Sequence, residues 1–131
     1  MAKYFTREEA EALLPQIEPL LLELQERHQS LQPLRQELEA LQQRMRGNGH
    51  GLHDHLERLN RQYAALLEEV NQLIRRIYAF GCQIKDPAMG LIDFPALRNG
   101  EEILLCWRLG EEGIHWWHDT TSGFAGRQPL D

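Results

Sequence analysis

The sequence predicts an α+β protein in which a long antiparallel helical hairpin, similar to a coiled coil, carries a small C-terminal antiparallel β-meander on its open end. Through residues 6–80, apolar side chains recur with a seven-residue period, which is typical of a helical seam. From residue 81 the period changes, short apolar runs alternate with turn sequences, and all three tryptophans follow. We therefore expect a single domain over residues 1–131, with the hairpin turn at 46–51 and the meander and its closing tail at 81–131.

The first helix is expected to begin after Thr6, because "TREE" places Glu9 three residues later and completes a capping box. Its segment contains three prolines, and a proline inside a helix removes a hydrogen bond. Pro19 and Pro33 share one heptad position that faces away from the partner helix, so both are compatible with the seam. Pro15 leaves two alternatives open, a continuous helix or a break just before it. The two seam positions of this helix hold Leu13, Ile17, Leu20, Leu24, Arg27, Leu31, Leu34, Leu38, Leu41 and Met45.

The second helix follows "RGNGHG", a stretch rich in helix breakers that suits a reversal of the chain. Its seam alternates steps of four and three and ends at Gly81, a residue favoured just after a helix. If the helices run antiparallel, opposing residues have numbers with a constant sum. Every layer from Met45 with Leu52 to Ile17 with Phe80 gives 97, which predicts one continuous register. The seam of the second helix holds Leu52, Leu56, Leu59, Tyr63, Leu66, Val70, Leu73, Ile77 and Phe80.

The apolar stripe is broad near the open end of the hairpin and narrow near its tip. A broad stripe requires a second packing partner, whereas a narrow one requires only the facing helix. The meander is therefore expected to cover the open end and to leave the tip projecting or paired with another chain. The residues that broaden the stripe are Leu14, Leu21, Leu22, Leu67, Ile74 and Tyr78.

The segment after Gly81 predicts three or four short antiparallel strands. Asn99–Gly100 is a strong hairpin signal, and Pro95 is confined to an edge or a bulge. In the strand "EEILLCWRL", alternation puts Trp107 on the face expected to pack on the helices and Cys106 on the opposite face. The tail "GFAGRQPL" is expected to form a closing loop rather than a strand.

Composition excludes several classes of protein. The net charge is −6 and neither half of the chain is basic, so we expect no nucleic-acid partner. No apolar run approaches the roughly 20 residues that span a bilayer, so we expect no membrane segment. Cys82 and Cys106 are far apart and outside zinc-motif spacing, and the start of the sequence shows no signal-peptide core, which favours the cytoplasm.

Several strings also resemble a known family. The opening "YFTREEAEALLP" and the C-terminal strings "GLIDFP", "LCWRLGE" and "GFAGR", with Trp117–His118, are similar to a bacterial domain-of-unknown-function family, number twenty-two-oh-three. The resemblance covers essentially the whole chain. It implies a small cytoplasmic protein without an assigned activity, and it supplies no mechanism.

Two functional hypotheses from different classes remain. The first is a cytoplasmic structural or protein-interaction module that self-associates through its helical hairpin as a homodimer, because two long helices alone leave apolar edges exposed. The second is a binding protein for a small molecule or a divalent metal ion, or a metal-dependent enzyme, with its site around His118 and Arg127 in the sheet. A pocket lined by those polar residues favours the second, and Arg127 simply paired with an acid favours the first.

The residues of the second hypothesis gather on or beside predicted turns. The candidates for ligand binding are Asp86, Asp93, Trp117, His118 and Arg127, and those for a metal ion are His118, Asp119 and Asp93. A structural alternative is that the two earlier aspartates cap turns while His118 and Arg127 anchor the tail.

A weaker metal candidate is "HGLHDH" at the hairpin tip, with His50, His53 and His55. A polar loop explains this tract equally well, with Asp54 as the N-cap of the second helix. Cys106 paired with a histidine would suggest nucleophilic catalysis, but a thiol in mid-strand tends to be buried and unreactive. No phosphate loop, dinucleotide fingerprint or nucleophile elbow occurs in the sequence, which therefore leans away from an enzyme.

Overall fold

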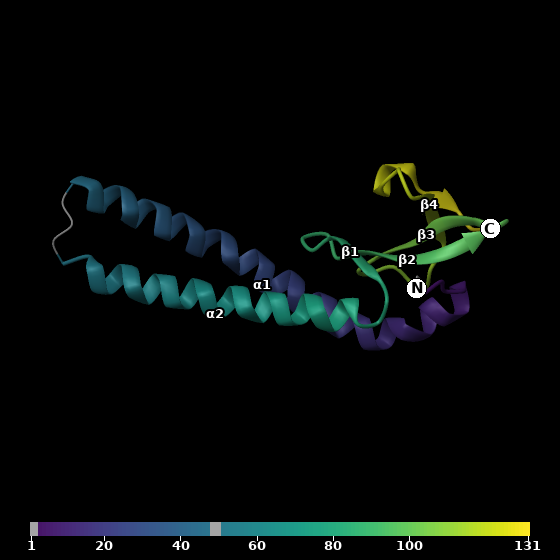
Figure 1. Cartoon of the computed structure of the whole chain (residues 1–131), viewed down its shortest axis with the longest axis horizontal. Coiled ribbons are helices and arrows are strands. Elements are labelled where there is room, and N and C mark those ends of the chain that lie inside the picture. Colours follow the sequence, from purple (N-terminus) through teal and green to yellow (C-terminus); the bar gives the residue numbers. More distant parts are fainter. Residues whose placement is uncertain (1–2, 48–50) are drawn as a thin grey trace.

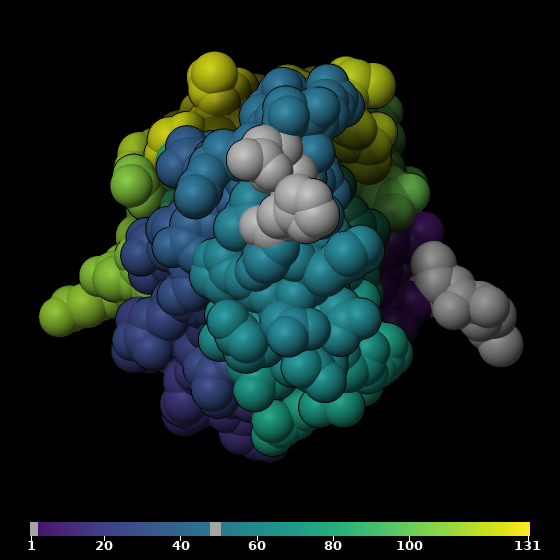
Figure 2. All heavy atoms as spheres, turned by 90° about the vertical axis from the view of Figure 1, so that its left-hand side faces the viewer, coloured from purple at the N-terminus to yellow at the C-terminus, as the bar shows by residue number. Residues whose placement is uncertain are grey.

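The computed structural model describes residues 3–47 and 51–131. A helical hairpin projects from one end of a five-stranded antiparallel sheet (Figure 1). Figure 2 looks along the hairpin from its tip and shows the two helices side by side, with parts of the sheet visible around their outline. At the sheet end, the two ends of the chain meet, where Arg7 Nη1 lies 3.1 Å from Asp131 Oδ1. This arrangement confirms the predicted α+β fold.

Helix α1, Arg7–Gly47, starts with the predicted capping box. The Thr6 N–H donates to Glu9 Oε1 at 2.9 Å, and the Glu9 N–H donates to Thr6 Oγ1 at 3.1 Å. Because these bonds satisfy backbone N–H groups that have no partner within the helix, they fix where α1 begins. The helix runs unbroken through its three prolines, so the continuous alternative for Pro15 is correct.

Helix α2, His53–Tyr78, returns along α1. The predicted turn at 46–51 lies partly outside the described residues. Asp54 is not the N-cap, because Leu52 occupies that position and no side chain caps it. The helix ends two residues before the predicted Phe80, and the chain leaves it through Gly81 at φ +101°. A Cβ at Gly81 would lie 2.8 Å from the ring of Phe5, so close packing also favours glycine there.

The predicted antiparallel register holds along the hairpin. Leu38 and Leu59, which should oppose each other, lie in one buried cluster with Leu41. Nearer the sheet, Leu24 and Leu73 share the main core with Leu21, which belongs to the broadened stripe. Seam residues in both regions therefore pack as the constant sum of residue numbers predicts.

The sheet follows the order of the chain, β1-β2-β3-β4-β5, and every pairing is antiparallel. The sheet has five strands, whereas three or four were predicted, and the tail is not only a loop. It forms a turn of 3-10 helix and then the two-residue strand β5, which is too short and too proline-rich to leave a pattern in the sequence. The elements are β1 (Gln83–Asp86), β2 (Leu91–Arg98), β3 (Glu101–Arg108), β4 (Trp116–Asp119), η1 (Phe124–Gly126) and β5 (Gln128–Pro129).

Turn chemistry fixes the central pair of strands. Asn99 and Gly100 have φ values of 53° and 81°, as a two-residue hairpin turn requires. Strand β1 pairs with β2 only as far as Asp93. Pro95 therefore lies in the part of β2 that has no β1 neighbour on that side. Its carbonyl there accepts the N–H of Phe5 at 2.8 Å. Pro95 is thus at a local edge, as predicted.

One face of the sheet packs on the helices. Phe94, Leu105 and Trp107 share the main buried core with Ile17 and Ile77 of the two helices, which confirms the predicted inward face of β3. The opposite face of the sheet, called here the outer face, is turned away from the helices. It is covered instead by the tail, and it holds the polar residues described next.

Candidate functional site

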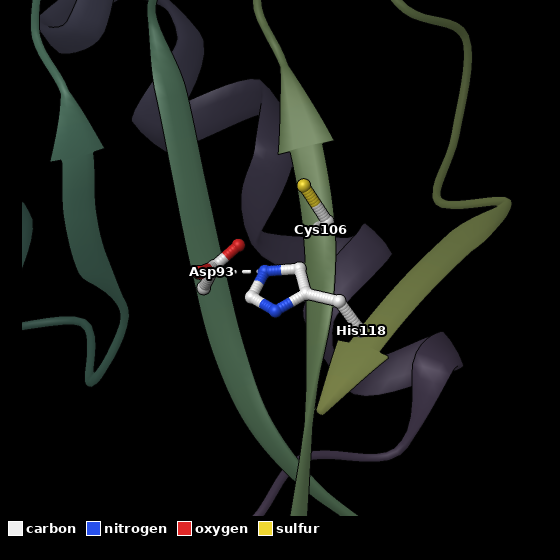
Figure 3. Close-up of side chains that lie close together, drawn as sticks. All are labelled: Asp93, Cys106 and His118. Carbon is white, nitrogen blue, oxygen red and sulfur yellow. Dashed lines mark hydrogen bonds and ion pairs between the residues drawn. The ribbon is translucent and has the colours of Figure 1, made fainter. Parts of the chain in front are cut away.

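A buried polar cluster lies on the outer face and draws one residue from each of three neighbouring strands. Asp93 comes from β2, Cys106 from β3 and His118 from β4 (Figure 3). Asp93 and His118 are 0% and 2% exposed, and Cys106 is fully buried as well. Charged and polar side chains are rarely buried so completely unless they are paired or bind a ligand.

The register of the strands explains how the three side chains meet. Asp93 lies directly opposite Cys106, and His118 lies opposite Leu104, two residues earlier in β3. Because side chains alternate between faces, these residues share the outer face. The His118 ring reaches across β3 and points at Asp93 (Figure 3).

Hydrogen bonds define the protonation of the histidine. Nδ1 of His118 lies 2.8 Å from the carbonyl oxygen of Asp119. Since a carbonyl only accepts, Nδ1 carries a proton and donates it. Nε2 lies 3.0 Å from Oδ2 of Asp93, so one further proton is shared between the ring and the carboxyl group.

The second oxygen of Asp93, Oδ1, is buried and has no hydrogen-bond partner. Burial raises the pKa of the Asp93 carboxyl, and the adjacent imidazole of His118 partly offsets this rise. Burial likewise raises the pKa of the Cys106 thiol to about 11. A buried carboxylate oxygen without a partner is costly, so it requires either a compensating ligand or a structural explanation.

The three side chains offer a suitable donor set for a metal ion. One nitrogen, one sulfur and one carboxylate oxygen all lie within 4.8 Å of one another. In a tetrahedral zinc site the ligand atoms are roughly 3–4 Å apart, so a shift of about an ångström would close the cluster around an ion. Nitrogen and thiolate ligands favour zinc over magnesium or calcium, which prefer oxygen alone.

Arg127 closes the cluster on the side of Cys106. Its Nε donates to Cys106 Sγ at 3.3 Å, and its Nη1 and Nη2 pair with the Glu111 carboxylate at 2.8 and 2.6 Å. The guanidinium carbon lies 4.5 Å from the Phe124 ring centroid and 5.5 Å from that of Trp116. Burial is the largest single influence on Glu111 and opposes its ionisation, but the hydrogen bonds from Arg127 and from the Arg108 N–H, with the charges of both arginines, together lower the pKa of that carboxyl.

A cavity of ≈ 240 Å³ opens beside the cluster. Asp93 and His118 form part of its wall, Lys85 of β1 lines another part, and a loop of small polar residues, 120–123, runs along its rim. The remaining lining residues are Leu91, Leu104 and Phe124. Asp93 and His118 are therefore the members of the cluster that lie beside this cavity, whereas Cys106 does not line it.

Of the residues singled out from the sequence, Asp93 and His118 are brought together, Arg127 contacts their neighbour Cys106, and two others have structural roles. Asp86 Oδ1 accepts the N–H groups of Ala88 and Met89, so this aspartate caps a turn. Asp119 Oδ1 accepts the N–H groups of residues 121 and 122 and the Thr121 hydroxyl, which lowers the pKa of Asp119 to about 2. These hydrogen bonds engage both carboxylates within their own turns and not with the cluster.

Trp117 and the histidines of the tip lie elsewhere. Trp117 opposes Leu105 and packs against the main core, on the face of the sheet away from Arg127. Arg127 stacks on Trp116 instead. His53 and His55 are exposed at the start of α2, whereas His50 lies outside the described residues.

Sequence reasoning missed some contributors to this region. Cys106 was weighed only as a nucleophile, although its alternation with Leu105 put it on the same face as Arg108 and away from the core. The clearest signal of the cluster in the sequence was Asp93, an acid inside the apolar string "LIDFPA". In the structure every residue of that string is buried. Lys85 carried no signal for a site. It comes near Asp93 only because β1 pairs with β2.

Comparison with known proteins identifies the family. The family model described as "Uncharacterized conserved protein (DUF2203)" matches residues 3–130. The chain belongs to DUF2203. No curated protein and no solved structure matches the chain. DUF2203 membership leaves the function unknown, so the function has to be argued from the geometry of the site.

The helices give one further finding. Within residues 3–47 and 51–131, neither α1 nor α2 has a stretch apolar enough, and of sufficient length, to cross a bilayer.

Proposed function

We propose that this protein binds one divalent transition-metal ion of the zinc type through Asp93, Cys106 and His118. The observation that carries the proposal is the fully buried donor triad with the unpartnered Oδ1 of Asp93 at its centre. Binding would give that oxygen a partner and would replace the shared proton between Asp93 and His118. An ion would enter from the adjacent cavity, which Asp93 and His118 line, and would take its fourth ligand from that side.

The surroundings of the triad support the same proposal. Histidines that bind metals usually donate their other ring N–H to a carbonyl or a carboxylate, which fixes the ring. The Nδ1–H of His118 does so toward the Asp119 carbonyl at 2.8 Å. Arg127 donates to the Cys106 sulfur and so partly offsets the burial that raises the pKa of this thiol, whose deprotonated form binds metals.

The experiment is calorimetric titration of the chelator-treated full-length chain with Zn²⁺. We expect one ion per chain, and Cys106→Ser should lower the affinity by more than about tenfold. Cys82→Ser is the matched control, because Cys82 is also buried and has a pKa raised to about 11, yet lies in the core among the helices. A variant with His50, His53 and His55 replaced by alanine removes any ion held at the tip.

A second substitution separates binding from folding. In Asp93→Asn the side-chain amide can donate to a neutral His118, so the hydrogen bond survives while the anionic ligand is lost. We expect near-unchanged thermal stability of the metal-free protein and strongly weakened Zn²⁺ binding. Absence of heat in the tip-histidine variant, or equal affinities in Cys106→Ser and Cys82→Ser, would exclude the site.

The hairpin supports a second candidate function, self-association as a homodimer. Around the buried Leu38, Leu41 and Leu59, other seam residues are only half-buried by the facing helix. A second hairpin packed alongside would cover them, as in a four-helix bundle. Sedimentation tests this directly: a monomer at tens of micromolar argues against the dimer, and Leu34→Glu should dissociate a dimer if one forms. These half-buried residues are Leu34, Met45, Leu52, Leu56 and Tyr63.

A further inference from the structure

We infer that the cavity beside Asp93 and His118 binds a small organic carboxylate, whose carboxylate group occupies the open position of the metal ion. This inference rests on the proposed metal site. It is carried by three features of the cavity: its size, the charge of its lining and the presence of both polar and apolar residues in that lining.

Size restricts the ligand. The cavity measures ≈ 240 Å³, which is below the roughly 300–1,000 Å³ of pockets that hold drug-sized molecules. A water molecule takes about 30 Å³ in the liquid, so the space suits a few ordered waters or one organic molecule of a few heavy atoms. Nucleotides and peptides are too large for it.

Charge restricts the ligand further. The ionisable lining residues are Lys85, Asp93 and His118. With a divalent ion bound, the carboxylate of Asp93 and the thiolate of Cys106 balance its charge, and the ammonium of Lys85 remains. The carboxylate of Asp119 does not line the cavity, and its Oδ1 accepts three hydrogen bonds within its own turn. A monoanion therefore completes the charge balance.

The lining of the cavity is partly polar and partly apolar. Lys85 and the hydroxyls of Thr120 and Ser122 can donate to an oxyanion, whereas the Thr121 hydroxyl already donates to Asp119. Leu91, Leu104 and Phe124 supply apolar contacts. An inorganic anion would leave these apolar side chains facing water, whereas a carboxylate with a short hydrocarbon chain can contact polar and apolar residues together.

The loop that forms the rim is held in place. The turn after β4 is fixed by Asp119 Oδ1, which accepts from Ser122 N–H at 2.6 Å and from the Thr121 hydroxyl at 3.0 Å. Gly126 allows the tail to close on this loop, because a Cβ there would lie 2.7 Å from the Ser122 side chain. A rim fixed in this way presents its polar groups in one arrangement before a ligand arrives, which lowers the entropic cost of binding.

The test uses the full-length chain loaded with Co²⁺ in place of Zn²⁺, because Co²⁺ absorbs in the visible range and reports its coordination. Acetate, butyrate and inorganic phosphate are titrated separately, and the change in the absorption spectrum is recorded. We expect both carboxylates to change the spectrum. Butyrate should bind up to about tenfold more tightly than acetate, because its two further methylene groups can contact the apolar lining residues.

Lys85→Gln should weaken both carboxylates by about fivefold, the effect of one partly exposed charge. Lys3→Gln is the matched control, since Lys3 is the other lysine of the chain and lines a different region, over the ring of Phe5. It should leave both affinities unchanged.

The outcomes distinguish the two proposals. If Co²⁺ produces no sulfur-to-metal absorption band, the metal site is wrong and this inference fails with it. If the band appears but no carboxylate changes the spectrum, the metal site stands and the carboxylate is excluded. Tighter binding of phosphate than of butyrate, or equal effects of Lys85→Gln and Lys3→Gln, would also overturn the inference.

Discussion

The two ends of the hairpin are stabilised by different amounts of packing. Toward the tip, in the part of the hairpin called here the arm (31–47 and 51–66), the separate buried cluster consists of Leu38, Leu41 and Leu59. At the clamped end, where the sheet covers the helices, both helices, β2, β3 and Phe5 contribute to one continuous core. The arm therefore depends on one helix facing another, whereas the clamped end has a third layer. The polar cluster lies outside this core, on the outer face of the sheet, where Arg127 of the tail covers it.

The largest effect that tests this contrast is expected for Trp107→Ala. Trp107 is 1% exposed at the centre of the clamped end, and its indole N–H donates to the Glu111 carbonyl at 3.1 Å. Removing it should lower the free energy of unfolding by about 3–5 kcal/mol, measured by urea denaturation. Leu97→Ala is the control, because Leu97 is 54% exposed and its loss should change stability by less than about 0.5 kcal/mol.

In the arm, Leu38→Ala is expected to cost less, about 2 kcal/mol, at the low end for a buried leucine. Leu38 retains 8% exposure and has only the facing helix as a partner. Amide hydrogen exchange should also be faster around Leu38 than around Ile17 in the same helix, because local opening needs fewer contacts to break. Equal exchange protection at the two places would contradict the contrast, and would suggest that another chain covers the arm.

This difference between the arm and the clamped end also explains which side-chain contacts could be predicted from the sequence. In the arm each seam residue meets one partner, so periodicity alone places Leu38 against Leu59. At the clamped end Leu14 and Leu21 are buried more deeply than the seam residues Leu13 and Leu20, because the sheet draws a broader face of α1 inward. Periodicity indicates that α1 has a second packing partner here, but it does not predict which residues on the broader face of the helix become buried.

The polar cluster was predictable only in part, for a related reason. An aspartate within an apolar strand indicates a buried acid, and Asp93 was among the predicted site residues. Its partners depend on the register between β3 and β4, which the irregular connection at residues 109–115 sets. No turn motif in that connection predicts that His118 lies opposite Leu104. Consequently Trp117 was grouped with Arg127, although the structure puts the two on different faces.

A smaller effect should come from the starts of the two helices. Thr6 caps α1 through the reciprocal bonds with Glu9, whereas no side chain caps the start of α2. Thr6→Ala should therefore lower the free energy of unfolding by about 1 kcal/mol in thermal denaturation. Asp54→Ala, in the first turn of α2, is the matched control and should have a smaller effect. A larger loss in the control would mean that the start of α2 matters more to folding than the capped start of α1.

The smallest predicted effect is a dependence of stability on pH, and it compares an ion pair beside the sheet with an ion pair in the hairpin. The pKa of Glu111 is lowered in the folded protein, since the hydrogen bonds and charges of Arg127 and Arg108 together outweigh the cost of burial. A group with a lowered folded pKa stabilises the protein above its unfolded pKa, ordinarily 4.5, and loses that contribution as the pH falls through the folded value. Glu111→Gln should thus destabilise the protein at neutral pH by less than about 1 kcal/mol, because the pair is partly exposed. The difference from the unsubstituted protein should vanish in acid.

The control for this pH effect is Glu69→Gln in the hairpin. Glu69 pairs with Arg27 at 3.2 Å across the two helices, but its side chain is 55% exposed. Water screens such a pair, so its removal should change stability little at any pH. If Glu111→Gln and Glu69→Gln gave the same pH profile, Arg127 would be holding the tail through its stacking on Phe124 and Trp116 rather than through its ion pair.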